Sequence, residues 1–96
     1  MQKYEIMFIV KTTISEKEVE TTISNLKKVI TDFGGKITNF KELGQKQLAY
    51  PIKKEISGFY CCLYPEADSA CIAEFDRKAQ IDENVLRHLI VKLDEE

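Results

Sequence analysis

The sequence predicts an α+β fold in which a four-stranded antiparallel sheet carries two helices on one face. Three observations lead to this prediction. Apolar runs of strand length lie at 3–10 and 59–64, and an amphipathic helix pattern with start and stop signals lies at 15–35. The order strand, helix, strand then recurs, so that residues 3–48 and 55–93 follow the same plan.

The first strand is expected over 3–10, because this run is rich in aromatic and β-branched residues and too short for a helix. Alternate residues face opposite sides of a strand. One side would carry Tyr4, Ile6, Phe8 and Val10, and the other Glu5, Met7 and Ile9. Both sides are largely apolar, which is typical of a strand at the centre of a sheet.

The first helix is expected to begin at Ser15, which forms a capping box with Glu18. Apolar residues then recur at spacings of three and four and predict one buried stripe. Its members are Val19, Ile23, Leu26, Ile30 and Phe33. Gly34 and Gly35 supply the left-handed residue that ends such helices.

A loosely alternating edge strand is predicted over 36–46, with a bulge at Gly44. Because proline cannot donate to a sheet ladder, Tyr50-Pro51 and residues 52–55 are expected to form a long, partly exposed connection. The third strand follows over 59–64. The second and third strands would thus form a hairpin with a projecting basic tip.

The third strand is expected to end at Pro65, and Asp68 to cap a second helix. The buried stripe of this helix would consist of Cys71 or Ile72, Phe75 and Ala79. A turn over 81–84 then leads into the last strand, 85–93.

This order of elements is the ferredoxin-like, split βαβ arrangement, and 1–96 has room for a single domain of this kind. Right-handed crossovers place the first and third strands in the middle of the sheet and the other two at its edges. The face away from the helices would be open to a partner. We expect it to carry Met7, Ile9, Phe59, Cys61 and Leu63.

Composition excludes several classes of protein. With 44% hydrophobic and 31% charged residues, the chain has the balance of a soluble globular protein. Its longest apolar runs fall far short of the roughly 20 residues that cross a bilayer, and no secretory leader pattern follows Met1, so a cytoplasmic location is expected. Three cysteines and one histidine lack metal-ligand spacing, so we expect no metal site and cysteines that pack in the core.

The sequence holds no catalytic constellation. It has no glycine-rich phosphate loop, and its one histidine, His88, lies inside a strand without a nucleophile motif. His88 is therefore expected to be a core or solvent-facing residue, with RNA contact as the alternative. Some ferredoxin-like phosphatases hold phosphate in a glycine- and arginine-bearing loop after the first strand, but residues 11–13 are Lys-Thr-Thr. The prediction is a protein that is not an enzyme.

The net charge of −2 conceals a basic end and an acidic end. Residues 36–54 hold five lysines and one acid, whereas 65–76 hold four acids and no base. Lys46, Lys53 and Lys54 surround Tyr50, which is a pattern of phosphate-binding charges around a ring that stacks on a base. A solvated lysine face and a locally packed turn tyrosine explain the pattern equally, so charge alone leaves both interpretations open.

Three segments resemble the bacterial small-subunit ribosomal protein six family: KYEIMFIV at 3–10, LGQKQLAYPIKK at 43–54 and IDENVLRHLIVK at 81–92. The resemblance covers essentially the whole chain. It implies a structural ribosomal protein without cofactor, membrane or small-molecule substrate. Such a protein would bind the central domain of small-subunit ribosomal RNA, as a heterodimer with small-subunit ribosomal protein eighteen, during assembly and translation.

The resemblance also implies which residues bind. The RNA contacts would be Lys3, Lys46, Gln47, Lys53, Lys54 and Arg87. The partner protein would contact Leu48, Tyr50, Pro51 and Ile52. One modest basic patch on a chain of negative net charge binds RNA weakly, so a basic partner would supply the missing charge. The rival hypotheses are a ferredoxin-like small-ligand sensor or oligomerising interaction domain, and an acyl-phosphate hydrolase.

Overall fold

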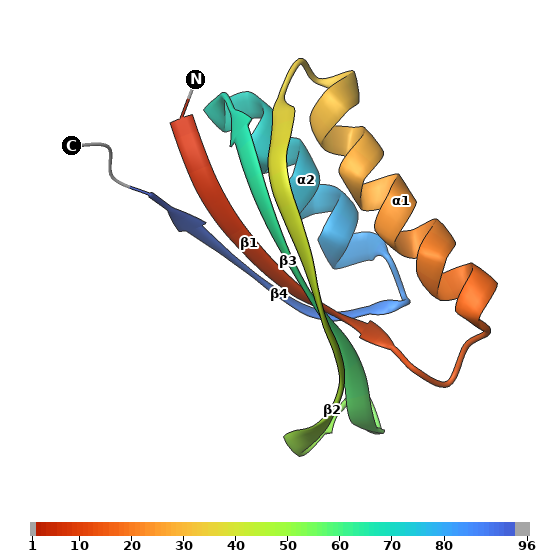
Figure 1. Cartoon of the computed structure of the whole chain (residues 1–96). Coiled ribbons are helices and arrows are strands. Elements are labelled where there is room, and N and C mark those ends of the chain that lie inside the picture. The colour runs from red at the N-terminus through yellow and green to blue at the C-terminus, as the bar shows by residue number, and fades with distance from the viewer. Residues whose placement is uncertain (1, 94–96) are drawn as a thin grey trace.

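A computed structural model describes residues 2–93 and confirms the predicted order of elements. The elements are β1 (Gln2–Lys11), α1 (Glu16–Asp32), β2 (Lys36–Ile52), β3 (Glu55–Ala67), α2 (Ser69–Ile81) and β4 (Val85–Lys92). The sheet has the order β2-β3-β1-β4, and all its neighbouring strands are antiparallel. Both helices pack on one face of the sheet (Figure 1).

The main core lies between the sheet and the two helices. The predicted inward side of β1 is confirmed, because Ile6, Phe8 and Val10 are fully buried there. The prediction for β3 was wrong. Directly paired residues of antiparallel strands share a face, and Phe8 pairs with Cys61. Three β3 residues therefore face the helices rather than the open side, namely Phe59, Cys61 and Leu63.

The open face of the sheet carries a mixed set of side chains. On the two central strands, Met7 and Ile9 lie beside residues of β3 that alternate with the core residues, Tyr60, Cys62 and Tyr64. On the β4 edge, Leu89 pairs with Met7 and is 61% exposed. This face is thus apolar toward β4 and aromatic toward its centre.

Helix α1 begins as predicted and ends with one difference. The hydroxyl of Ser15 accepts a hydrogen bond of 3.2 Å from the backbone N–H of Glu18, which confirms the N-cap. Phe33 was expected on the buried stripe but is 55% exposed. It is the C-cap residue, with φ −98° and ψ 22°, so its side chain has left the helical stripe; Gly34 follows with φ +83°.

The β2–β3 connection is much shorter than predicted. Strand β2 continues through Tyr50 and Pro51 to Ile52, and Lys53 and Lys54 alone form the turn. Both have positive φ, 51° and 69°, as a two-residue type I′ hairpin turn requires. The proline is tolerated because β2 is an edge strand, where a missing N–H leaves no partner unpaired.

Two irregularities let the β2–β3 pair bend. The predicted bulge is confirmed, since the register shifts between Glu42 and Gly44, and Gly44 has φ +91°. The prediction that β3 ends at Pro65 was wrong, because the strand continues to Ala67. Opposite Pro65 the register of β2 shifts, and the Thr38 hydroxyl donates to the Tyr64 carbonyl at 2.7 Å. The proline thus sits at a bulge that does not need its N–H.

Helix α2 packs through the predicted residues, since Cys71, Ile72, Phe75 and Ala79 are all buried. Asp68 occupies the N-cap position, although its side chain makes no capping hydrogen bond. Within residues 2–93, neither α1 nor α2 is long and apolar enough to cross a membrane.

The three cysteines are buried and form no disulfide. Cys61 and Cys71 pack in the main core as small hydrophobic residues, as predicted, whereas Cys62 faces the open side and its thiol donates to Glu5 at 3.6 Å. Burial raises the pKa of the Cys61 thiol to about 12, with the nearby charge of Glu42 adding to the effect. Burial also raises the pKa of Cys62 and Cys71. The thiols are therefore protonated and inert at neutral pH.

We expect the free energy of unfolding to fall as the pH rises above about 8.5, where thiols of the unfolded chain ionise. The unfolded state then binds fewer protons than the folded state, in which Cys61 keeps its proton toward pH 12. Cys61 alone should account for a loss on the order of 1–2 kcal/mol between pH 8 and pH 10. Urea unfolding at both pH values measures it. The variant Cys61→Ala should show a shallower dependence, and identical curves would contradict the burial of this thiol.

Candidate nucleic acid and partner interface

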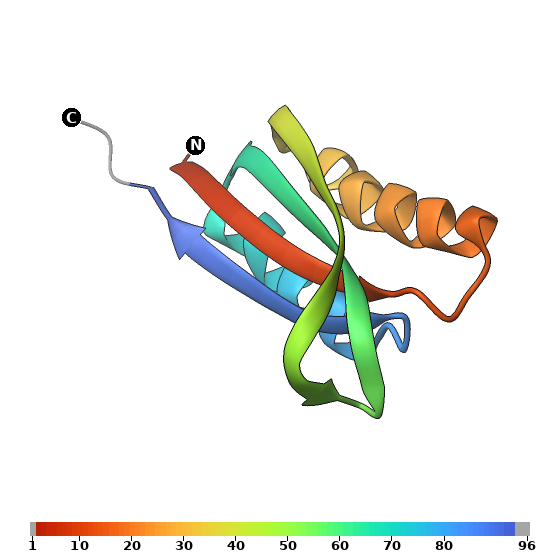
Figure 2. The same ribbon diagram turned by 60° about the horizontal axis from the view of Figure 1, so that its bottom comes forward.

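The β2–β3 hairpin extends past the helices and ends beside β4. Figure 1 shows it projecting beyond the helical layer, and in Figure 2 the hairpin crosses the start of β4. Two contacts anchor it there. The ammonium group of Lys53 donates to the Val85 carbonyl at 3.1 Å, and the Arg87 guanidinium donates to the Tyr50 hydroxyl. The tip is therefore attached to the sheet rather than freely exposed.

A small second core lies between the hairpin and strands β1 and β4. Leu48 packs there with Ile9 and Leu86, and Ile52 packs against them half-buried. Leu48 is only 9% exposed, so it stabilises the hairpin from within and contributes little to its exposed surface. Gly58 is required nearby, because a Cβ at this position would lie 2.2 Å from Cγ2 of Ile9. Of the predicted partner residues, Tyr50 and Pro51 are the exposed ones.

The structure brings five of the six predicted RNA-binding residues to one end of the molecule. The hairpin carries four of them, all exposed: Lys46, Gln47, Lys53 and Lys54. Arg87 joins them from β4 through its contact with Tyr50. Lys3 does not belong to this group, since it pairs with Glu66 at the opposite end of β1.

Two lysines of β2 lie over tyrosine rings on the open face. The ammonium nitrogen of Lys46 is 5.6 Å from the centroid of Tyr60, and that of Lys41 is 5.6 Å from the centroid of Tyr64. These are cation–π contacts. Sequence reasoning missed Lys41 and both tyrosines because it gave β3 the wrong face. Alternation from the core residue Cys61 would have found them.

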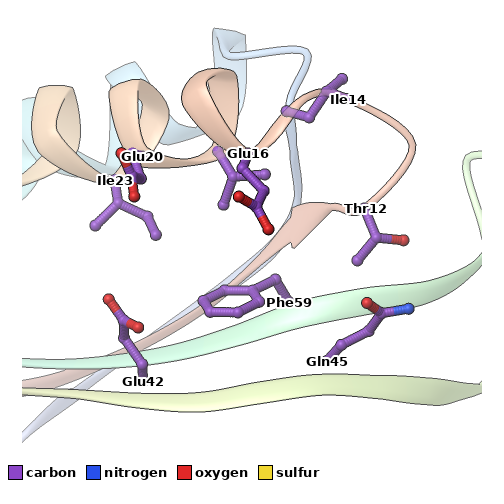
Figure 3. Close-up of a pocket in the computed structure, with 9 residues that line it drawn as sticks. Thr12, Ile14, Glu16, Glu20, Ile23, Glu42, Gln45 and Phe59 are labelled. Atoms are coloured by element: carbon purple, nitrogen blue, oxygen red, sulfur yellow. The ribbon is translucent and has the colours of Figure 1, made fainter.

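An acidic hollow lies away from the hairpin tip, between the start of α1 and strands β2 and β3. Its volume is about 350 Å³, and its walls carry three carboxylates, those of Glu16, Glu20 and Glu42. Figure 3 shows Glu16 extending from α1 toward the ring of Phe59, and Glu42 extending from the opposite wall toward α1. Carboxylates so placed repel phosphates, so this hollow does not suit a nucleic-acid backbone.

The only histidine has a structural contact. Its Nε2 lies 2.6 Å from Oδ1 of Asp76 on α2, and the His88 side chain is 15% exposed. This agrees with a histidine near the core that ties β4 to α2. Among residues 2–93, no group of three or more His, Cys, Asp or Glu side chains is placed to hold a metal ion.

The fold and surface together define a ferredoxin-like domain with a basic surface at the hairpin end. The family model of ribosomal protein S6 matches residues 3–92, nearly the whole chain. Among solved structures, the 30S ribosomal protein S6 of Thermotoga maritima is similar, with a TM-score of 0.90 and 28% sequence identity. The match covers 96% of this chain and 87% of that one.

The chain belongs to the ribosomal protein S6 family, as the sequence resemblance implied. It is therefore an RNA-binding protein of the small ribosomal subunit, and the family is structural rather than enzymatic. This assignment favours the ribosomal hypothesis over the sensor and hydrolase alternatives, which have no comparable support.

Proposed function

We propose that the chain binds the central domain of small-subunit ribosomal RNA as a heterodimer with small-subunit ribosomal protein eighteen, and that it joins the cytoplasmic ribosome in this form. The observation that carries the proposal is the gathering of cations at one end of the fold. Lys46, Lys53 and Lys54 of the hairpin meet Arg87 of β4 there. Family membership supplies the context in which such a cluster meets ribosomal RNA.

The proposed partner explains how a chain of net charge −2 reaches sufficient affinity. Each neutralised phosphate adds an increment of binding that salt screens, and this chain gathers few cations in one place. A basic partner adds contacts of its own. The hairpin offers that partner an exposed Tyr50, 55% accessible, and next to it Pro51. Aromatic anchors of this kind often dominate protein interfaces.

We expect the affinity for RNA to rise at least about tenfold when the partner is present. The measurement is a titration of a central-domain ribosomal RNA fragment at near-physiological salt, with this chain alone and with the two proteins mixed. Sedimentation of the protein mixture without RNA tests the heterodimer separately. Equal affinity in both titrations would contradict the need for a partner, and no binding in either would overturn the proposed function.

A further inference from the structure

A second hollow, opposite in charge to that of Figure 3, lies where the hairpin tip meets β4 and the end of α2. Its volume is about 460 Å³. It is lined by Lys53, Ala79, Gln80, Val85, Leu86, Arg87 and His88. Among these described side chains are two cations and a histidine but no carboxylate. Such a lining suits an anion rather than a cation or an apolar ligand.

Local backbone irregularities place both cations at this hollow. Lys53 has a φ of 51°, in the left-handed region. A lysine adopts this conformation only at a cost in free energy, which the surrounding hairpin offsets. On β4, Arg87 pairs with Ile9 whereas Val85 pairs with Val10, so the strand bulges at this point. Bulges redirect side chains and are common beside functional sites. Here the bulge leaves Leu86 buried and Arg87 exposed.

Internal hydrogen bonds hold the two cations in position without using up their donors. The Lys53 ammonium gives one hydrogen bond to the Val85 carbonyl and retains two N–H groups. The Arg87 guanidinium donates to the Tyr50 hydroxyl and retains most of its five donors. Both groups are therefore fixed before a ligand arrives, which lowers the entropic cost of binding.

The part of the wall formed by Gln80 and His88 is fixed as well. The Gln80 amide donates to Oδ2 of Asp76 at 3.1 Å, and His88 contacts Oδ1 of the same carboxylate at 2.6 Å. Asp76 thus connects two residues of the wall although it does not line the hollow itself.

We propose that this hollow binds one phosphate of the RNA backbone, with Lys53 and Arg87 as its charged ligands and Gln80 and His88 as its wall. The proposal rests on the proposed function and adds a position to it. One phosphate enters between the hairpin tip and β4, while the exposed lysines of the hairpin remain available to neighbouring phosphates. A fixed guanidinium recognises a phosphate with two parallel hydrogen bonds, which a flexible surface lysine does not provide.

Two adjacent turn residues provide a matched test. Lys53→Asn and Lys54→Asn each remove one charge at a position of positive φ, which asparagine tolerates well. Among the described lining residues of the hollow is Lys53 but not Lys54. Binding of the central-domain RNA fragment by the protein pair is measured over a range of salt. We expect K53N to weaken binding about tenfold and to reduce the salt slope by about one. K54N should weaken binding less than about threefold.

The outcomes separate this proposal from the one on which it depends. Equal losses of RNA affinity in K53N and K54N would overturn the proposed phosphate site, because the charge of the turn, rather than the hollow, would then determine binding. If neither variant loses affinity while the wild type binds, the phosphate site is overturned and the proposed function stands. Failure of the wild-type pair to bind would overturn the function itself. If K53N does not fold, Arg87→Gln replaces it, with the exposed Arg77→Gln on α2 as its control.

Discussion

Replacement of Phe75 by alanine is expected to reduce the free energy of unfolding by about 3–5 kcal/mol. Phe75 is fully buried on α2, within the core that this helix shares with α1 and the sheet. Its removal forfeits the transfer of a large ring from water and leaves a cavity, because neighbouring elements relax only partly. Domains of this size have total stabilities of about 5–15 kcal/mol, so the melting temperature should fall by roughly 15 °C or more.

The chain contains its own control for this experiment. Phe33→Ala makes the same chemical change at a site that is 55% exposed, so it should cost less than about 1 kcal/mol. Urea unfolding of the wild type and both variants compares them directly. Similar losses in the two variants would contradict the placement of Phe75 in the core and of Phe33 outside it.

The contrast between these two phenylalanines shows what periodicity predicts and where it fails. The predicted buried stripe of α1 is confirmed through Ile30, because apolar residues spaced by three and four lie on one face of a helix. It failed at Phe33, where the helix ends and the backbone no longer follows that spacing. The prediction of the inward face of β3 failed for a different reason. Its run Phe59–Tyr64 is apolar on both sides, so alternation does not reveal the inner face, and the pairing of Phe8 with Cys61 decides it.

The hairpin was predicted in outline but not in detail. Lys53 and Lys54 lack the Asn-Gly signal of a two-residue turn, and Pro51 suggested an early end to β2. The charge pattern nevertheless located three of the cations that gather at this end, Lys46, Lys53 and Lys54, and the family resemblance added Arg87. The hollow beside them was not predictable, because Lys53, Gln80 and Arg87 come from three elements that only the tertiary fold brings together.

Reversing two hairpin charges should weaken RNA binding on the order of 100-fold, or about 2.7 kcal/mol. The variant is Lys46→Glu combined with Lys53→Glu, and the assay uses the central-domain RNA fragment with the partner protein. Each glutamate removes a cation that is expected to meet a phosphate and adds repulsion in its place. Both lysines are exposed and neither belongs to the main core, so the domain should remain folded.

A control of equal charge separates local contact from the overall field of the molecule. Lys17→Glu with Lys28→Glu changes the net charge by the same amount on exposed positions of α1, away from the hairpin. It should weaken binding only several-fold, through long-range repulsion that salt screens. Loss of the circular dichroism signal in the hairpin variant would contradict the placement of both lysines outside the main core. Equal weakening by both double variants would mean that total charge, rather than the hairpin, determines binding. A large loss confined to K46E/K53E requires phosphates close to the hairpin tip, since distant charges are screened within about 8–10 Å at these salt concentrations.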